Sequence, residues 1–198
     1  MAFTFFFRDR HTLDLIGRHV APHFRGKHYV HIWDAGCANG AEPYSLAMIL
    51  REQLSEFAFR NVRIWATDVD PQFGAIVGLG RYRQDEVRRS PAPFRERYFG
   101  PSEERGYVEV AEALRRAVRF QQHDLRSLRP IRDGLALIVC KNVLLHLRGE
   151  QVVEVVRMFR HALGLGGFLA IERTQALPIE ASTWFRQVTP EGQLFQRV

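Results

Sequence analysis

Apolar residues recur along this chain in two alternating patterns, one typical of buried strands and one typical of helices. The run YVHIWDA, residues 29–35, is rich in aromatic and β-branched side chains and ends at a glycine, which predicts a buried strand entering a turn. Pro43 then fits a first helical turn, and apolar residues recur at helical spacing over 46–54. The run VRIWATD, residues 62–68, predicts a second strand. A strand–helix–strand unit of this length indicates a parallel pair joined by a right-handed crossover.

The same alternation returns after an interruption. Residues 81–117 are dense in Arg and Glu, and we expect a small inserted subdomain there, helical at first and then β. Beyond it we predict strands over 118–121, 135–140 and 167–172, a helix over 150–163, and a C-terminal hairpin from FRQV, TPEG and LFQRV. The apolar run LALIVC indicates a strand covered on both faces, and Gly164, Gly166 and Gly167 are expected to end the helix.

This order of elements predicts an α/β fold, with a doubly wound, mostly parallel sheet that ends in a C-terminal antiparallel hairpin. We expect a single domain over 1–198, because a chain of 198 residues supports one sizeable core and not two. In such sheets ligands bind outside the carboxyl ends of the strands. The residues that follow each predicted strand are therefore the candidates for chemistry.

Composition bears on the kind of partner. The chain has 28 Lys and Arg against 22 Asp and Glu, a formal net charge of +6, and 26 of the 28 cationic residues are Arg. Because the planar Arg fork suits carboxylates and phosphates, a glutamate-rich protein surface and nucleic acid both fit this charge. A solvated basic surface without a partner is the alternative.

Location and metal content are also constrained. No apolar run approaches the roughly 20 residues needed to span a bilayer. Charges in MAFTFFFRDR stand where a signal peptide needs apolar residues, so we expect a cytoplasmic protein without membrane insertion. Cys37 and Cys140 lie in apolar segments, with no second Cys or His at metal-ligand spacing. They are predicted to be buried, reduced thiols, and no metal site is expected.

The first candidate motif is the glycine loop DAGCANGAEPYS, residues 34–45. Gly36 and Gly40 allow a sharp turn and a close approach of the backbone to a ligand, and the helix start beyond them offers unpaired amide donors. The loop departs from the GxGxxG dinucleotide fingerprint. By itself it is compatible with S-adenosylmethionine (SAM), with a nucleotide, or with a plain tight turn.

Polar residues also follow the next two strands. Asp68 can accept hydrogen bonds from both ribose hydroxyls, whereas Asp70 is the better candidate for capping the helix after Pro71. After the strand over 118–121, Asp124 can meet an adenine amino group and Leu125 can cover the ring. The alternative for Asp124 is a capped turn, and the spacing does not decide between them.

Two further segments carry candidate chemistry. Asn142 follows the apolar strand over 135–140, where a buried amide needs a hydrogen-bond partner. His146 is either an acid or base or a surface residue of a helix start. At the N-terminus, Phe5–Phe7 are either a lid or a core anchor, with a frayed terminus as the alternative. Arg8 beside them can hold an anionic substrate.

Taken in order, these segments resemble the CheR family of chemotaxis receptor methyltransferases. The matching segments are Thr4 with Phe6–Asp9, Ala35–Ser45, Ala66–Asp70, Cys140–Leu147 and Gly166–Leu169. Gly80, Tyr82, Tyr98, Phe99, Val118 and Phe120 fit the family pattern between them. The match covers nearly the whole chain, and AGCxxGxEPYS is far more specific than a generic glycine loop.

The resemblance implies a Rossmann-like class I SAM-dependent methyltransferase fold, with a small β insertion that can dock on the receptor. It implies methyl transfer to glutamate carboxylates of a membrane chemoreceptor, with S-adenosylhomocysteine (SAH) as product and the receptor's acidic helices as partner. The resemblance implies that Arg8 acts at the substrate, and His146, a candidate from the residue pattern, is the second predicted catalytic residue. The implied cofactor-binding residues are Thr4, Arg8, Ala35, Gly36, Glu42, Asp68, Asp124, Leu125, Asn142 and Val143.

Departures from the family pattern leave other functions open. The family's N-terminal helical domain has no counterpart in this sequence, so we expect a catalytic domain lacking it. Ala2, Ala41, Lys141, His146 and the segment ERTQA, residues 172–176, replace the family's residues. The alternatives are a methyltransferase for another acidic protein or a small acid, and a catalytically weak SAM- or SAH-binding regulatory module. We expect a monomer and no nucleic-acid partner, because CKNV differs from the Asn/Asp-Pro-Pro-aromatic tetrad used on exocyclic amines.

Overall fold

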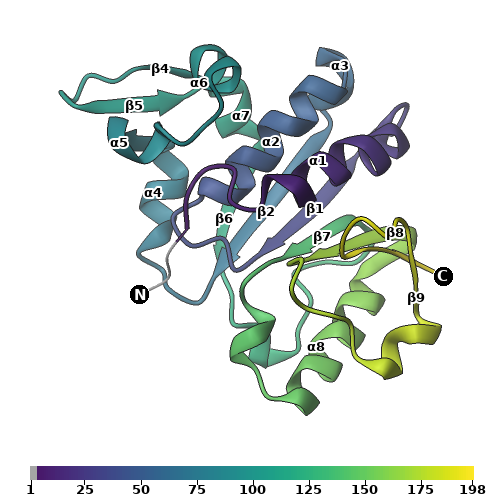
Figure 1. Ribbon diagram of the computed structural model, residues 1–198. Helices are drawn as coiled ribbons and strands as arrows, with labels where there is room; N and C mark the ends of the chain where they lie inside the picture. The colour runs from purple at the N-terminus through teal and green to yellow at the C-terminus, as the bar shows by residue number, and fades with distance from the viewer. Residues whose placement is uncertain (1–3) are drawn as a thin grey trace.

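A seven-stranded sheet forms the centre of the computed structural model, which describes residues 4–198 (Figure 1). Ala2 lies outside the described residues. The strands, in spatial order, are β6 (Val118–Gln122), β2 (Val62–Asp68), β1 (Val30–Ala35), β7 (Leu135–Cys140), β8 (Leu163–Ile171), β10 (Leu194–Arg197) and β9 (Phe185–Gln187). The first five run parallel, and β10 is antiparallel to both β8 and β9. The predicted mostly parallel sheet with a C-terminal antiparallel hairpin is confirmed.

Helices cover both faces of this sheet, as a doubly wound fold requires. On one face lie α1 (Arg10–His19) and α2 (Ala41–Gln53), whose apolar residues share a core cluster with Ile32 of β1. On the other face, α8 (Gly149–Ala162) buries Phe159 edge-on against Trp33 of β1, with 5.3 Å between ring centroids. Because side chains alternate across a strand, neighbouring residues of β1 serve different cores.

The order of the strands creates a topological switch point between β1 and β7. From β1 the chain continues to β2 and β6 on one side, and it then crosses to β7 and β8 on the other. In open parallel sheets, a crevice forms at such a point outside the carboxyl ends of the strands. The loops after β1 and β7 are therefore the walls of the expected site.

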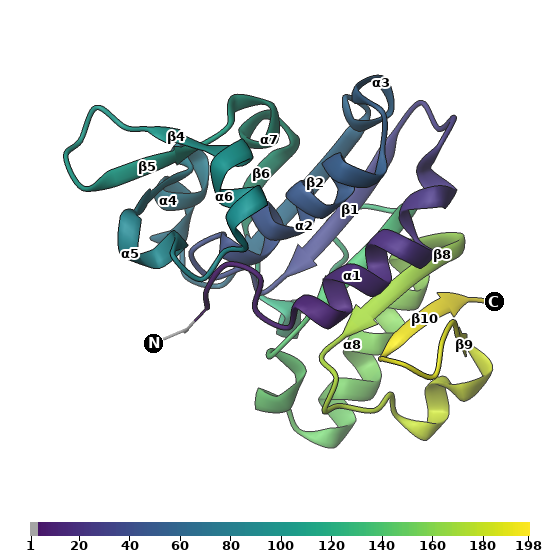
Figure 2. The same cartoon turned by 45° about the horizontal axis from the view of Figure 1, so that its top comes forward.

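A second, three-stranded antiparallel sheet stands beside the central one, at the upper left of Figures 1 and 2. Its strands are β3 (Arg81–Arg83), β5 (Tyr107–Val110) and β4 (Phe99–Pro101), in that order. The helices of this region are α5 (Gln84–Val87), α6 (Ala92–Tyr98) and α7 (Glu112–Ala117). The helices α5 and α6 precede β4 and β5, in the predicted order of a helical part and then a β part, but β3 before them and α7 after them were not predicted.

The short elements complete the described chain. They are the helices α3 (Glu56–Phe59) and α4 (Phe73–Leu79) and the 3₁₀ turns η1 (Ala21–Phe24), η2 (Leu125–Ser127), η3 (Leu144–His146) and η4 (Ile179–Thr183). Among the described residues, every helix is too short or too polar to span a bilayer.

The glycines after α8 have a different role from the predicted one. The helix ends at Ala162, and Gly164, Gly166 and Gly167 lie inside β8. Gly166 has φ +71°, and the pairing of β7 with β8 shifts register between Leu135 and Leu137. A Cβ on Gly167 would come within 2.9 Å of the backbone oxygens of Gly164 and Leu135. The prediction that these glycines end the helix is wrong, because they form an irregularity in the strand instead.

The N-terminal segment is a core anchor. Phe6 is 1% exposed and packs edge-on against Tyr82 and Phe99, at 4.8 and 5.1 Å between ring centroids. Phe7 is buried against Phe94, at 4.8 Å. In Figures 1 and 2 the segment runs from beside the second sheet into α1. These contacts decide between the alternatives left open above, and they fix the position of Arg8.

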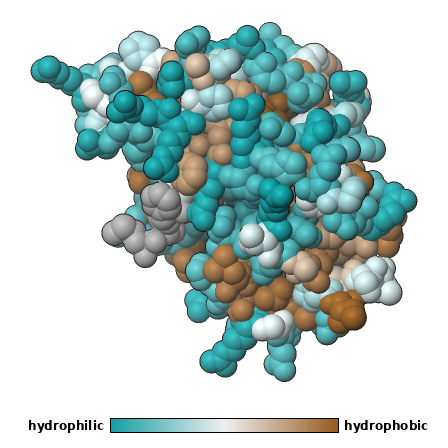
Figure 3. Space-filling view, viewed as in Figure 1, coloured by the Kyte–Doolittle hydropathy of each residue, from teal (hydrophilic) through white to brown (hydrophobic). Residues whose placement is uncertain are grey.

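The surface drawn in Figure 3 is mostly hydrophilic, and hydrophobic colour gathers in its lower half, over the region of α8 and β9. Large exposed apolar side chains of the C-terminal half include Leu145, Leu165 and Ile179, at 51%, 84% and 84%. Of these, Leu145 stands next to the site described below.

Candidate functional site

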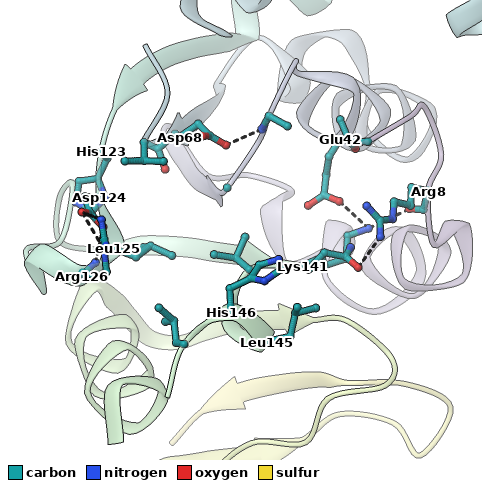
Figure 4. Close-up of a pocket in the computed structure, with 18 residues that line it drawn as sticks. Arg8, Glu42, Asp68, His123, Asp124, Leu125, Arg126, Lys141, Leu145 and His146 are labelled. Atoms are coloured by element: carbon teal, nitrogen blue, oxygen red, sulfur yellow. Dashed lines mark hydrogen bonds and ion pairs between the residues drawn. The ribbon is translucent and has the colours of Figure 1, made fainter. Parts of the chain in front are cut away.

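A cavity of about 570 Å³ opens at the carboxyl ends of β1, β2, β6 and β7, where the switch point predicts it (Figure 4). Its volume falls within the range of roughly 300–1,000 Å³ usual for small-molecule sites. Its walls come from the loops after these strands, from the start of α2 and from the N-terminal segment. The lining residues are Thr4, Arg8, Gly36, Ala38, Glu42, Thr67, Asp68, Val69, His123, Asp124, Leu125, Arg126, Lys141, Asn142, Val143, Leu145, His146 and Leu147.

The glycine loop after β1 is shaped by close packing. Gly36 has φ +97°, and a Cβ there would stand 2.1 Å from Cγ2 of Val143. Gly40 begins α2 with φ +89°, where a Cβ would lie 2.8 Å from the Tyr82 hydroxyl. Only glycine satisfies both the left-handed backbone and the space at these positions. The loop therefore lies directly against the loop after β7.

Asp68, the last residue of β2, holds the glycine loop from the other side. Its Oδ2 accepts the amide of Ala38 at 2.9 Å, and its Oδ1 accepts the amide of Asp70 at 3.1 Å. Each carboxylate oxygen has a further acceptor position, so the group can still receive a diol. Asp70 accepts the amide of Gln72 at 2.9 Å and so closes the turn before α4. The residue that precedes α4 is Gln72, so the prediction that Asp70 caps this helix is wrong.

A buried ion pair joins three segments at the cavity wall. Lys141 Nζ lies 2.9 Å from Glu42 Oε2, and the two side chains are 0% and 8% exposed. The same ammonium donates to the backbone oxygen of Arg8 at 3.1 Å. Burial raises the pKa of Glu42, and Lys141 opposes that shift. The pair thus ties α2 and the end of β7 to the N-terminal segment.

A second acid lies behind this pair. Asp34 of β1 is fully buried, and within residues 4–198 neither of its carboxylate oxygens has a hydrogen-bond partner. Burial raises the pKa of Asp34 well above its usual range, Glu42 and Asp68 raise it further, and Lys141 lowers it. Since Lys141 is already bound to Glu42, burial and the neighbouring acids favour the protonated form of the Asp34 carboxyl.

The N-terminal segment meets the loop after β7 in strained backbone. Phe7 and Asp9, on either side of Arg8, have φ values of +59° and +50°, and Asn142 has φ +58°. Arg8 Nη2 donates to Asn142 Oδ1 at 2.9 Å, and the Phe7 amide donates to Ser45 Oγ at 2.9 Å. Non-glycine residues rarely adopt this conformation, and such strain collects at functional sites.

The far end of the cavity carries a second charged pair, at the left of Figure 4. The Arg126 guanidinium donates to both oxygens of Asp124, at distances from 2.8 to 3.1 Å. These hydrogen bonds lower the pKa of Asp124. Leu125 is 7% exposed and adds an apolar surface, and His123 stands edge-on to Trp33, with 5.3 Å between ring centroids.

Comparison with known proteins decides the family. The model of the CheR methyltransferase SAM-binding domain matches residues 2–193. This chain belongs to the CheR methyltransferase family. A probable chemotaxis protein methyltransferase of Rhizobium etli is 27% identical over 192 residues, which cover 94% of this chain and 72% of the relative. A chemotaxis protein methyltransferase of Listeria monocytogenes is 31% identical over 170 residues, 84% of this chain and 62% of the relative.

Solved structures support the fold of this CheR domain. The rRNA methyltransferase AviRa of Streptomyces viridochromogenes matches with a TM-score of 0.58 and 17% identity, over 98% of this chain and 85% of AviRa. At that identity the likeness concerns the fold alone. The predicted class I methyltransferase architecture is confirmed.

SAM is the cofactor of this CheR domain, and the cavity residues fit its chemistry. SAM carries two positive groups, a ribose diol and an aromatic base. Glu42 and Asp68 line the cavity with carboxylates that would suit the positive groups and the diol, and Leu125 and Val143 line it with apolar surface that would suit the base. Gly36, which has a left-handed backbone and no side chain, lines the cavity with main-chain atoms alone.

The structure brings together every residue that the sequence predicted for the site except Ala35. The side chain of Ala35 is 1% exposed and packs in the core beneath α8 with Trp33. Any contact of Ala35 with a ligand would have to come from its main chain. The remaining predicted residues line one cavity, and Figure 4 shows His146 projecting into it. Their roles in binding and catalysis stay predictions.

Two charged residues of this CheR cavity were not predicted as members of the site. Lys141 is one of only two lysines in the chain and directly follows a fully apolar strand, a position that requires a buried partner. That pattern was a usable signal for a pair with an acid. Arg126 gave no such signal, because its binding to Asp124 depends on the turn at η2.

The raised pKa of Asp34 predicts a pH-dependent stability. Because the folded pKa lies above the unfolded one, the stability from protonated Asp34 is present at acid pH and is lost as the pH rises toward the folded pKa. We expect Asp34→Asn to lose less stability than the parent when the pH rises from 5 to 8. The melting temperature of Asp34→Asn minus that of the parent should therefore rise from pH 5 to pH 8.

The exposed Asp133→Asn is the matched control, and its melting temperature should follow the parent at every pH. Parallel curves for the parent and Asp34→Asn would show that Asp34 does not titrate as its burial requires.

Proposed function

We propose that this domain transfers the methyl group of SAM to glutamate side chains on acidic helices of a membrane chemoreceptor, forming a glutamate methyl ester. The relatives named as chemotaxis protein methyltransferases support this substrate. The observation that carries the proposal is the position of Arg8. Its guanidinium lies on the wall of the same cavity as Glu42, beside the residues proposed for the cofactor. A carboxylate held there would face the methyl donor.

The chemistry needs positioning more than proton transfer. A glutamate carboxylate is already ionised at pH 7, so no strong general base is required. Its oxygen attacks the methyl carbon, the carbon–sulfur bond breaks, and the electron pair stays on sulfur to give SAH. Since the charges of carboxylate and sulfonium both disappear, exclusion of water and alignment of the two groups favour the reaction.

The residues divide these tasks. Glu42 would face the positive end of the donor, and Asp68 would accept the ribose hydroxyls. Arg8 would align the acceptor carboxylate by a charge-assisted hydrogen bond. One positioned Arg is preferable to a cluster, because a tight clamp would stabilise the ground state as well. His146 projects into the cavity and is proposed as a catalytic residue that contacts the acceptor.

The proposal also assigns the surface that faces the receptor, the compartment and the oligomeric state. We treat residues 4–198 as one domain whose second sheet, within 81–117, faces the receptor. A cytoplasmic, monomeric protein would meet the cytoplasmic part of a receptor. The excess of Arg over acidic residues would favour encounter with acidic helices.

The product distinguishes this function from its rivals. Incubated with SAM labelled in the methyl group and a chemoreceptor fragment, the domain should label the fragment, and mild base should release the label as methanol. A glutamate methyl ester is base-labile, whereas an N-methyl group is not. Base-stable label would point to another acceptor, and no label on any acidic protein would favour a binding module.

The role of Arg8 predicts a split between turnover and cofactor affinity. We expect Arg8→Ala to lower the methylation rate about 100-fold, because a misplaced acceptor can cost that much. SAH affinity, measured by calorimetry, should change less than about fivefold. Arg10→Ala is the control, since Arg10 is exposed and pairs with Asp14 at 3.4 Å. Equal losses of rate and affinity in Arg8→Ala would contradict this role.

A further inference from the structure

Glu172 stands directly after β8, beside the end of β7, and it does not line the cavity. It is 7% exposed, and its Oε2 accepts the backbone amide of Asn142. Its Oε1 accepts the Thr174 hydroxyl at 3.3 Å. A buried carboxylate is costly unless hydrogen bonds compensate it, so its place next to the site calls for an explanation.

The residue that Glu172 binds is a strained one. Asn142 has φ +58°, a left-handed conformation that non-glycine residues adopt only with support from their surroundings. A hydrogen bond from an amide to a carboxylate is among the stronger ones in proteins. The Glu172 carboxylate thus binds the strained residue from a position directly after β8.

The backbone conformation of Asn142 affects the cavity through the side chains of Asn142 and Arg8. Asn142 lines the cavity, and its Oδ1 accepts Arg8 Nη2 at 2.9 Å. If the backbone at Asn142 relaxed to a right-handed conformation, the side-chain amide of Asn142 would turn away from Arg8. Glu172 also begins the segment 172–176, which departs from the family pattern.

We propose that Glu172 is a positioning residue, which holds the backbone of Asn142 in the left-handed conformation and so fixes the Asn142 amide and the Arg8 guanidinium in the cavity. It contacts neither cofactor nor substrate. The consequence for turnover rests on the proposed function, whereas the consequence for cofactor affinity does not.

Substitution separates the hydrogen bond from the charge. We expect Glu172→Ala to weaken SAH binding about tenfold by calorimetry and to lower the methylation rate at least as much. Glu172→Gln keeps an acceptor oxygen, so its SAH affinity should stay within about threefold of the parent. The exposed Glu180→Ala is the matched control and should leave both unchanged. Melting curves would confirm that each variant is folded at the temperature of titration.

A double-mutant cycle tests whether the effect passes through Asn142. In an Asn142→Ala background the cavity amide is already absent, so adding Glu172→Ala should change SAH affinity less than about twofold. A full tenfold loss in that background would overturn the proposal, as would a folded Glu172→Ala with the parent's SAH affinity. Failure of the proposed function would instead appear as base-stable or absent methyl product, with these SAH affinities unchanged.

Discussion

The buried pair of Lys141 and Glu42 is the interaction on which the site depends. Its two charges lie 2.9 Å apart at the cavity wall, and the lysine also holds the backbone of Arg8. Removing one member of a buried pair leaves an uncompensated charge, at a cost of roughly 3–5 kcal/mol. The ends of α2 and β7 and the N-terminal segment are therefore constrained together, and the cavity between them keeps its shape.

Charge in this region is closely balanced. Lys141 compensates Glu42, and the raised pKa of the neighbouring Asp34 opposes a second negative charge beside it. A cationic cofactor that enters the cavity would meet Glu42 on the cavity wall.

The sheet explains why these groups meet. Strand order reverses between β1 and β7, so the loops after them diverge and leave a crevice at the carboxyl ends. Gly36 lets one loop pack against Val143 of the other, and Asp68 closes the third side. The aromatic anchor at Phe6 fastens the second sheet to the same segment that carries Arg8. Cofactor and acceptor residues therefore converge from distant parts of the chain.

The spacing of apolar residues along the chain predicted most of the strands of the central sheet. The run 135–140 became β7 without a change of bounds, because a continuous apolar strand leaves a strong signal. The helix α1 was not predicted, and the glycines of β8 were misassigned because glycine serves both helix ends and strand irregularities.

The spacing of residues in the sequence could not predict contacts between residues that lie far apart in the chain. The pair of Lys141 with Glu42 and the support of Asn142 by Glu172 depend on how β7 and β8 are placed. Ala35 is the opposite case, because the two-residue period of a strand already placed it with Trp33, on the face that α8 covers.

Titration of SAH into the domain, followed by calorimetry, tests most directly whether this cavity is the cofactor site. Asp68→Ala should bind at least tenfold more weakly than the parent, about 1.4 kcal/mol, because the ribose loses a charged acceptor. Asp70→Ala, two residues away at a capped turn, should bind within about threefold of the parent. Tight binding by a folded Asp68→Ala, or no binding by the parent, would contradict the placement of the cofactor at the ends of β1, β2 and β7.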